Sequence, residues 1–222
     1  MGLAGSAFAD SFEEYCEKNL KPTQIVVRTD ISPSSKNNEL SYTDLSKMRQ
    51  HGSHGLANTF GLTHAKVHTT TQYNYHLLKH PSGRSCMRPS VEMQMAYTPI
   101  TLYVGREFPV GSCEHQFILS HEMRHEKVYV DYLKLASTLF TEEIKTFFAN
   151  KIFYGDSAQA LDKSLKESVE GYWQPRAQAW LDNIDKVQMS VDTPEEYSRV
   201  DTACNGGIPK IVKAAAQARR SR

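Results

Sequence analysis

Hydrophobic and polar residues alternate over much of the first half of the chain. Residues 62–78, LTHAKVHTTTQYNYHLL, alternate at every second position, as one face of a half-buried strand does. Shorter β-rich runs occupy residues 23–31, 90–97 and 100–108. The turn signals HPSGRS and TP separate them, and SYTDLSKMRQ suits a short helix between the first two strands. The pattern predicts a mostly antiparallel sheet over residues 22–110.

The second half changes to a helical period. Residues 113–150 contain no Pro or Gly and carry an apolar stripe at helical spacing, with Ser112 as a plausible cap. A second helix is predicted over residues 157–187, which Pro175 should kink or interrupt. We therefore expect an α+β fold in which the sheet is followed by a long helix and a second long helix. In that order of elements, the edge strand beside the first helix, here residues 100–108, would bind an extended peptide as an added strand.

The first helix contains the motif HExxH. His121 and His125 are four residues apart, so they lie about 40° apart on one helical face and can reach one ion. Glu122 would stand beside that ion and take a proton from a metal-bound water. These three positions predict a catalytic zinc site. A sheet followed by a long HExxH helix and further helices resembles the order of elements in zincin metalloproteases.

A catalytic zinc normally takes a third protein ligand. No histidine follows His125, which excludes the longer metzincin pattern and favours a carboxylate. If the two helices form an antiparallel hairpin centred near Tyr154, the residues opposite the histidines lie near 185, and Asp182 ranks ahead of Asp185. Glu170 ranks third, because it faces the histidines only if the first helix ends early.

Other polar residues are less strongly indicated as parts of the metal site. Asp131 lies off the histidine stripe, so it either orients a histidine or, more simply, pairs with a lysine on the surface. Seven further histidines are interpreted as surface residues: His51, His54, His64, His68, His76, His80 and His115.

Charge and composition limit the possible partners. Lys and Arg number 26 against 25 Asp and Glu, which gives a net charge of +1 and no basic field for nucleic acid or anionic lipid. No apolar run is long enough for a membrane span. The HExxH motif makes a peptide or protein substrate the expected partner. Residues 210–222 form a basic tail, which is interpreted as a solvated terminus, with an interaction arm as the alternative.

Several features favour a secreted or periplasmic protein. Residues 1–9 contain the pattern Ala-Phe-Ala that a signal peptidase reads, so they are interpreted as the remnant of an export signal, with a cytosolic N-terminus as the alternative. The four cysteines show no CxxC spacing, and two disulfides fit an exported protein. Of the three connectivities we favour Cys86–Cys113 with Cys16–Cys204, while four reduced thiols remain the cytosolic alternative.

Residues 10–209 would form a single zincin-like domain, β-rich over 22–110 and helical over 112–190.

The segments GSCEHQFILSHEMRHEKVYVDYL and WLDNID…VDTPEEYSRV resemble a bacterial family of secreted zinc-dependent proteases whose members are otherwise uncharacterised. The resemblance covers roughly residues 60–204 and is specific at HExxH. Members carry a Tyr-Asp-x-x-Thr-x-His-Gly segment in the second helical region, of which only the aspartate is matched here, by Asp182. The resemblance implies export and peptidase activity.

We therefore expect a zinc metallopeptidase in which His121, His125 and Asp182 hold Zn²⁺ and Glu122 activates water. A cationic or phenolic group, such as Tyr129, Tyr172 or a loop arginine, should stabilise the oxyanion. Two alternatives remain open: a non-catalytic module stapled by zinc, and a metal-free secreted binding or scaffold domain.

Overall fold

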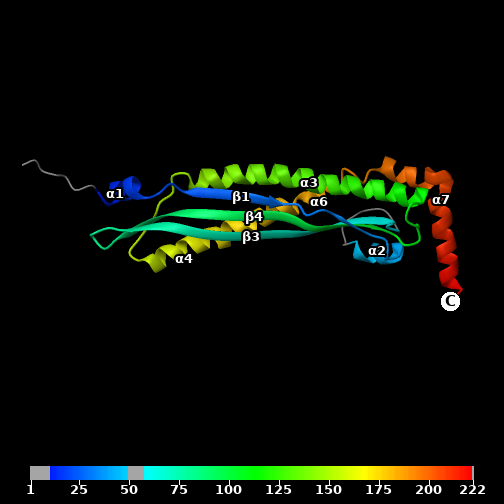
Figure 1. The fold of residues 1–222 in the computed structure, drawn as a ribbon, viewed down its shortest axis with the longest axis horizontal. Coiled ribbons are helices and arrows are strands. Elements are labelled where there is room, and N and C mark those ends of the chain that lie inside the picture. Colours follow the sequence, from blue (N-terminus) through cyan, green and yellow to red (C-terminus); the bar gives the residue numbers. More distant parts are fainter. Residues whose placement is uncertain (1–10, 50–57, 222) are drawn as a thin grey trace, which may run out of the picture. The chain divides into compact units, whose positions relative to one another are not determined.

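The structure, a computed structural model, describes residues 11–49 and 58–221 and is α+β. Its elements are α1 (Phe12–Asn19), β1 (Gln24–Asp30), β2 (Ser35–Asn37), α2 (Tyr42–Met48), β3 (Gly61–Lys79), β4 (Ser85–Val104), α3 (Cys113–Phe148), β5 (Phe153–Gly155), α4 (Ala158–Ser168), η1 (Val169–Trp173), α5 (Gln174–Asp182), α6 (Ile184–Gln188) and α7 (Pro194–Arg220) (Figure 1). The predicted export-signal remnant at residues 1–9, and His51 and His54, lie outside the described residues.

The strand β4 is the one with which the other strands pair. Within the described residues β1, β2, β3 and β5 each pair with β4. β2 runs parallel to it, with Ser35 opposite Thr101, and β5 runs antiparallel, with Cys86 opposite Tyr154. The sheet departs from the predicted mostly antiparallel arrangement, because β2 runs parallel to β4. Alternation along a strand indicates its buried face but not the direction of its neighbours.

The predicted long helix is confirmed as α3, whereas the predicted second helix is divided into α4, η1, α5 and α6. Buried residues recur at every fourth position, at Leu161, Leu165, Val169, Trp173 and Ala177. An α-helix has about 3.6 residues per turn, so such a stripe rotates by about 40° at each step. The wider turn of η1, a π-helix just before Pro175, takes up an extra residue and returns the stripe to the core.

The described chain divides into two compact units. Unit 1 comprises residues 11–28, Thr69–Gln94 and Ser137–Gln178, and unit 2 comprises Thr29–His68, Met95–Ala136 and residues 179–221. The long elements β3, β4 and α3 contribute residues to both units.

Each unit contains one disulfide. Cys16 is bonded to Cys86 in unit 1, and Cys113 is bonded to Cys204 in unit 2, with Cα atoms 6.2 Å and 5.8 Å apart. Disulfide formation was predicted, but both predicted pairings are wrong. The pairing depends on α1 packing against the start of β4 and on α7 reaching the start of α3, and neither contact can be read from cysteine spacing.

Unit 1 has an apolar, aromatic core. Phe140, Ile144 and Phe148 of α3 are fully buried. The ring of Trp173 lies 5.9 Å from that of Phe140 and 6.2 Å from that of Phe148, between centroids. The helical stripe of α4, η1 and α5 therefore has an apolar partner on α3.

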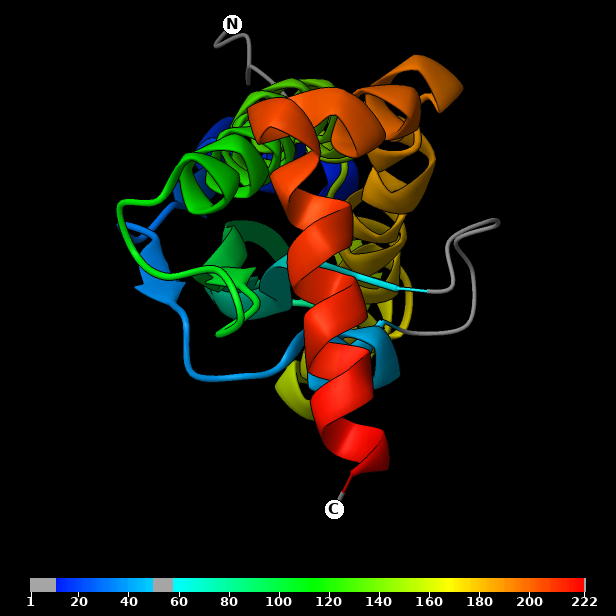
Figure 2. The same cartoon turned by 90° about the vertical axis from the view of Figure 1, so that its right-hand side faces the viewer.

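In unit 2, α7 is broken near its middle. Thr193 caps its first part, and Ala203 to Gly206 leave helical geometry, with Cys204, Asn205 and Gly206 at φ values of 53°, 56° and 69°. Figure 2 shows the chain after this break continuing in a different direction. Ile208, in the second part, packs against Val104, Phe108 and Ile118.

The basic tail belongs to the second part of α7. The helix continues to Arg220, and Arg219 donates to the Thr43 hydroxyl at 3.0 Å and stacks on the Tyr42 ring at 4.8 Å. The tail is therefore helical, its basic side chains are exposed within the described residues, and Arg219 contacts α2. Among residues 11–49 and 58–221, no helix combines the length and the apolar run needed to cross a membrane.

Candidate metal centre and cavity

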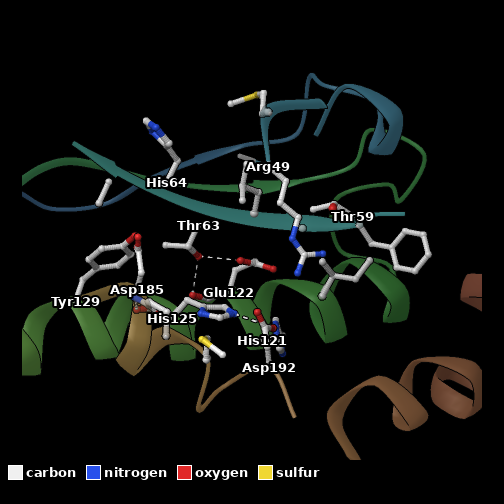
Figure 3. A pocket seen from close by; sticks show the side chains of 18 of the residues that line it. Arg49, Thr59, Thr63, His64, His121, Glu122, His125, Tyr129, Asp185 and Asp192 are labelled. Carbon is white, nitrogen blue, oxygen red and sulfur yellow. Dashed lines mark hydrogen bonds and ion pairs between the residues drawn. The ribbon is translucent and has the colours of Figure 1, made fainter. Parts of the chain in front are cut away.

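Three side chains of unit 2 converge at the HExxH segment of α3. His121 and His125 face one another with Nε2 atoms 3.1 Å apart, and Asp192 Oδ1 lies 3.2 Å from His121 Nε2 and 3.3 Å from His125 Nε2. The side chains of His121, His125 and Asp192 are 19 %, 13 % and 28 % exposed. Figure 3 shows the three drawn together beside α3. In the described part of the chain, these three side chains offer ligand atoms that lie close enough together to hold one metal ion.

The spacing of the three atoms fits a metal ion. A tetrahedral zinc with bonds of about 2.0–2.1 Å separates its ligand atoms by about 3.3–3.4 Å. The observed edges of 3.1, 3.2 and 3.3 Å nearly match one face of such a tetrahedron. Two imidazoles and a carboxylate are also a donor set that catalytic zinc uses. The group can therefore bind a metal ion.

Asp192, and not Asp182, joins the two histidines. Asp192 lies between α6 and α7, directly before the cap Thr193. The helical-hairpin argument that favoured Asp182 treats residues 157–187 as one straight helix. The breaks at η1, at Asn183 and after Gln188 invalidate that count. Asp185 lines the adjoining cavity, and Glu170 lies in unit 1, where it pairs with Lys166 at 3.8 Å.

A local signal for Asp192 was present in the sequence. Thr-Pro-Glu-Glu at 193–196 is a helix start, with a capping threonine and proline at the first helical position. An aspartate directly before such a start lies next to the positive end of the helix dipole. That signal marks the position but not its approach to His121, which depends on tertiary packing.

The two histidines and Asp192 are electrostatically coupled. Burial raises the pKa of Asp192, but contacts with His121 and His125 outweigh it and hold the pKa well below its usual value. Burial lowers the pKa of His125, and Asp192, Glu122 and Gln188 more than compensate, so the net shift is upward. The carboxylate is thus ionised, as a metal ligand must be.

Each histidine also has a partner at its second ring nitrogen. Gln188 Oε1 lies 2.7 Å from His125 Nδ1, and Gln188 Nε2 donates to the backbone carbonyl of His125 at 3.2 Å. Arg124 donates to His121 Nδ1 at 2.9 Å and forms an ion pair with Glu196, whose Oε2 lies 3.7 Å from the same Nδ1. Both rings are therefore fixed in orientation.

Glu122 lies beside the group and is not part of it. Its side chain is buried against β3, where the Thr63 hydroxyl lies 2.9 Å from Glu122 Oε2 (Figure 3). Burial raises the pKa of Glu122, and the nearby histidines partly offset this. Gly61 allows the close approach of the strand, because a Cβ there would lie 2.5 Å from Glu122 Oε1 and 2.6 Å from Ile118 Cγ2.

A cavity of about 750 Å³ adjoins the group. One wall is the consecutive run Gly61–His68 of β3, and the other includes His121, Glu122, His125 and Asp192. The strand beside the helix is therefore β3 and not residues 100–108, most of which belong to β4. The cavity therefore adjoins both histidines and Glu122.

Two hydrogen-bond donors that sequence reasoning did not identify also line the cavity. Tyr197 interacts with Arg49 and Asp192, and burial raises its pKa. An arginine was expected from a loop, and Arg49 is instead the residue that caps the end of α2. Tyr129 also lines the cavity, and burial, followed by the charge of Asp185, raises its pKa to about 12. Tyr172 is exposed in unit 1 and is therefore separate from the cavity.

The remaining polar predictions have mixed outcomes. Asp131 pairs with Lys127 on the surface, in agreement with the simpler interpretation. His64 and His68 are exposed, but His115 is buried, and burial lowers its pKa. The surface prediction for His115 is therefore wrong, because the charged residues around it in the sequence do not reveal the face that α3 turns inward.

Comparisons of the chain with protein-family models, with curated proteins and with solved structures find no match.

Proposed function

We propose that the chain is a zinc-dependent peptidase that acts outside the cytoplasm. One observation carries the proposal: a buried glutamate, Glu122, adjoins a three-residue group with metal-ligand spacing at the wall of a cavity. The resemblance of the HExxH segment to secreted zinc-dependent proteases supports the same reaction. The two disulfides and the order of a strand-rich half before the HExxH helix are compatible with an exported, zincin-like enzyme.

Each residue of the site would have a distinct role in the reaction. His121, His125 and Asp192 would hold the zinc, and the chemistry supplied by a bound zinc would be polarisation of a substrate carbonyl and a lower pKa of water. Glu122 accepts the proton of the attacking water and passes it to the leaving amine. Its raised pKa suits it to hold that proton in transit, and Thr63 fixes its Oε2. Tyr129, Tyr197 and Arg49 line the same cavity, and each carries a donor for the negative charge that would develop on the carbonyl oxygen.

The test combines elemental analysis with a peptide-library digest read by mass spectrometry, on protein without a histidine tag. We expect about one zinc per wild-type chain, as three protein ligands imply. Asp192→Ala should lose the zinc, and Asp182→Asn should keep it. Glu122→Gln should keep the zinc and lose about 10²–10⁴-fold in cleavage rate.

Three results would count against the proposal. A wild-type chain without zinc, even after reconstitution, would favour a metal-free binding domain. Stoichiometric zinc with no cleavage of any library peptide would favour a zinc-stapled module. Full cleavage by Glu122→Gln would remove the glutamate from the mechanism.

A further inference from the structure

Gln188, the last residue of α6, makes two hydrogen bonds to one residue of α3. Its Oε1 lies 2.7 Å from His125 Nδ1, and its Nε2 donates to the His125 carbonyl at 3.2 Å. Gln188 is partly buried and lines the cavity. A single side chain therefore contacts both the ring and the backbone of the same histidine.

The donor and acceptor roles in this pair follow from chemistry. A backbone carbonyl can only accept, so the amide NH₂ of Gln188 must face it and Oε1 must face the ring. Oε1 also only accepts, so His125 Nδ1 must carry a proton. In a neutral imidazole the other nitrogen, Nε2, then has a free lone pair. That Nε2 is the atom that lies 3.3 Å from Asp192 Oδ1.

His121 differs from His125 in this respect. Its Nδ1 faces a guanidinium donor from Arg124 at 2.9 Å and therefore acts as an acceptor. In the neutral ring the proton is then on Nε2, the atom turned toward His125 and Asp192. His125 is thus held with Nε2 unprotonated. His121 must first lose its Nε2 proton and carry one on Nδ1, where Glu196 Oε2 lies 3.7 Å away, before it can bind the same metal.

We propose that Gln188 is a positioning residue that holds His125 in its metal-binding tautomer before a metal arrives. The link to metal affinity rests on the proposed function, whereas the tautomer itself does not. Partners that fix a ligating histidine in this way contribute about 10–100-fold to metal affinity.

The test uses two substitutions of similar size at one position. Gln188→Leu removes the acceptor, and Gln188→Glu retains one. Zinc affinity, measured by competition with a chelator, should fall about 10–100-fold in Gln188→Leu and recover in Gln188→Glu. Gln116→Leu on the exposed side of α3 is the matched control and should bind zinc as wild type does. Circular dichroism and thermal melting check that each variant is folded.

A second readout needs neither zinc nor activity. Long-range ¹H–¹⁵N spectra of the metal-free protein should show the His125 proton on Nδ1 in the wild type and Gln188→Glu, and redistributed toward Nε2 in Gln188→Leu. Unchanged His125 signals in folded Gln188→Leu would overturn the proposal, as would wild-type zinc affinity in that variant. If the wild type binds no zinc, the proposed function fails and the spectra alone decide the role of Gln188.

Discussion

The two stretches of α3 bury their side chains in different ways. In unit 1, Phe140, Ile144 and Phe148 pack among aromatic rings. In unit 2, the same helix turns His121 and Glu122 inward. Apolar packing needs only shape and volume, whereas a buried polar group needs a specific partner. Thr63 is such a partner for Glu122. Removal of the Thr63 hydroxyl would therefore leave the buried carboxylate without this hydrogen bond.

The largest expected effect tests the apolar stretch. Phe148→Ala should lower the free energy of unfolding by about 3–5 kcal/mol, because it leaves a cavity beside Trp173. Chemical denaturation measures the loss. Phe147→Ala, at a residue that is 40 % exposed, should cost clearly less. Zinc affinity of the folded protein should not change in either variant, and a loss comparable to that of a ligand variant would contradict the distinction between the two stretches.

The two disulfides offer a matched comparison of intermediate size. Replacing either pair by serine should cost about 2–5 kcal/mol in unfolding free energy. Only Cys113→Ser with Cys204→Ser should also weaken zinc binding, because Cys204 anchors the helix that follows Asp192. Cys16→Ser with Cys86→Ser lies in unit 1 and is the control. Chelator competition on both double variants checks this, and equal zinc affinities would show that the anchor does not matter.

The smallest expected effect concerns one added methyl group. Gly61→Ala should cost about 1–3 kcal/mol in stability, because the new Cβ overlaps Glu122 and Ile118. Cleavage should fall with it, since the Glu122 carboxylate must move. Gly171→Ala in η1 has open space around the new Cβ and should change stability by at most about 0.5 kcal/mol. Thermal melting and peptide cleavage measure the two variants, and an active, stable Gly61→Ala would show that the close approach is not required.

Local patterns predicted the elements well and their assembly poorly. The absence of Pro and Gly over residues 113–150 is enough to place α3, and alternation is enough to place β3. The sheet's strand directions and the disulfide pairing depend on contacts between distant segments, which no local pattern contains. The π-helical turn η1 also has no clear sequence signal beyond Pro175.

The candidate site was predictable where one helix supplies the residues. Spacing alone brings His121 and His125 together and sets Glu122 beside them. Asp192 comes from a separate segment, and its predicted substitute, Asp182, came from counting residues along a helix that is in fact broken. Gln188 and Thr63 were missed because side chains that orient others have no motif of their own.

The bond between Cys113 and Cys204 has a consequence for the order of assembly. Cys113 begins the helix that carries His121, and Cys204 ends the first part of the helix that follows Asp192. A newly made chain in a reducing environment lacks this covalent link, so the segment with the third ligand is held by weaker contacts alone. Oxidation of these two cysteines would therefore couple the folding of the segment that carries Asp192 to the redox state of its surroundings, because the covalent link forms only where disulfides are stable.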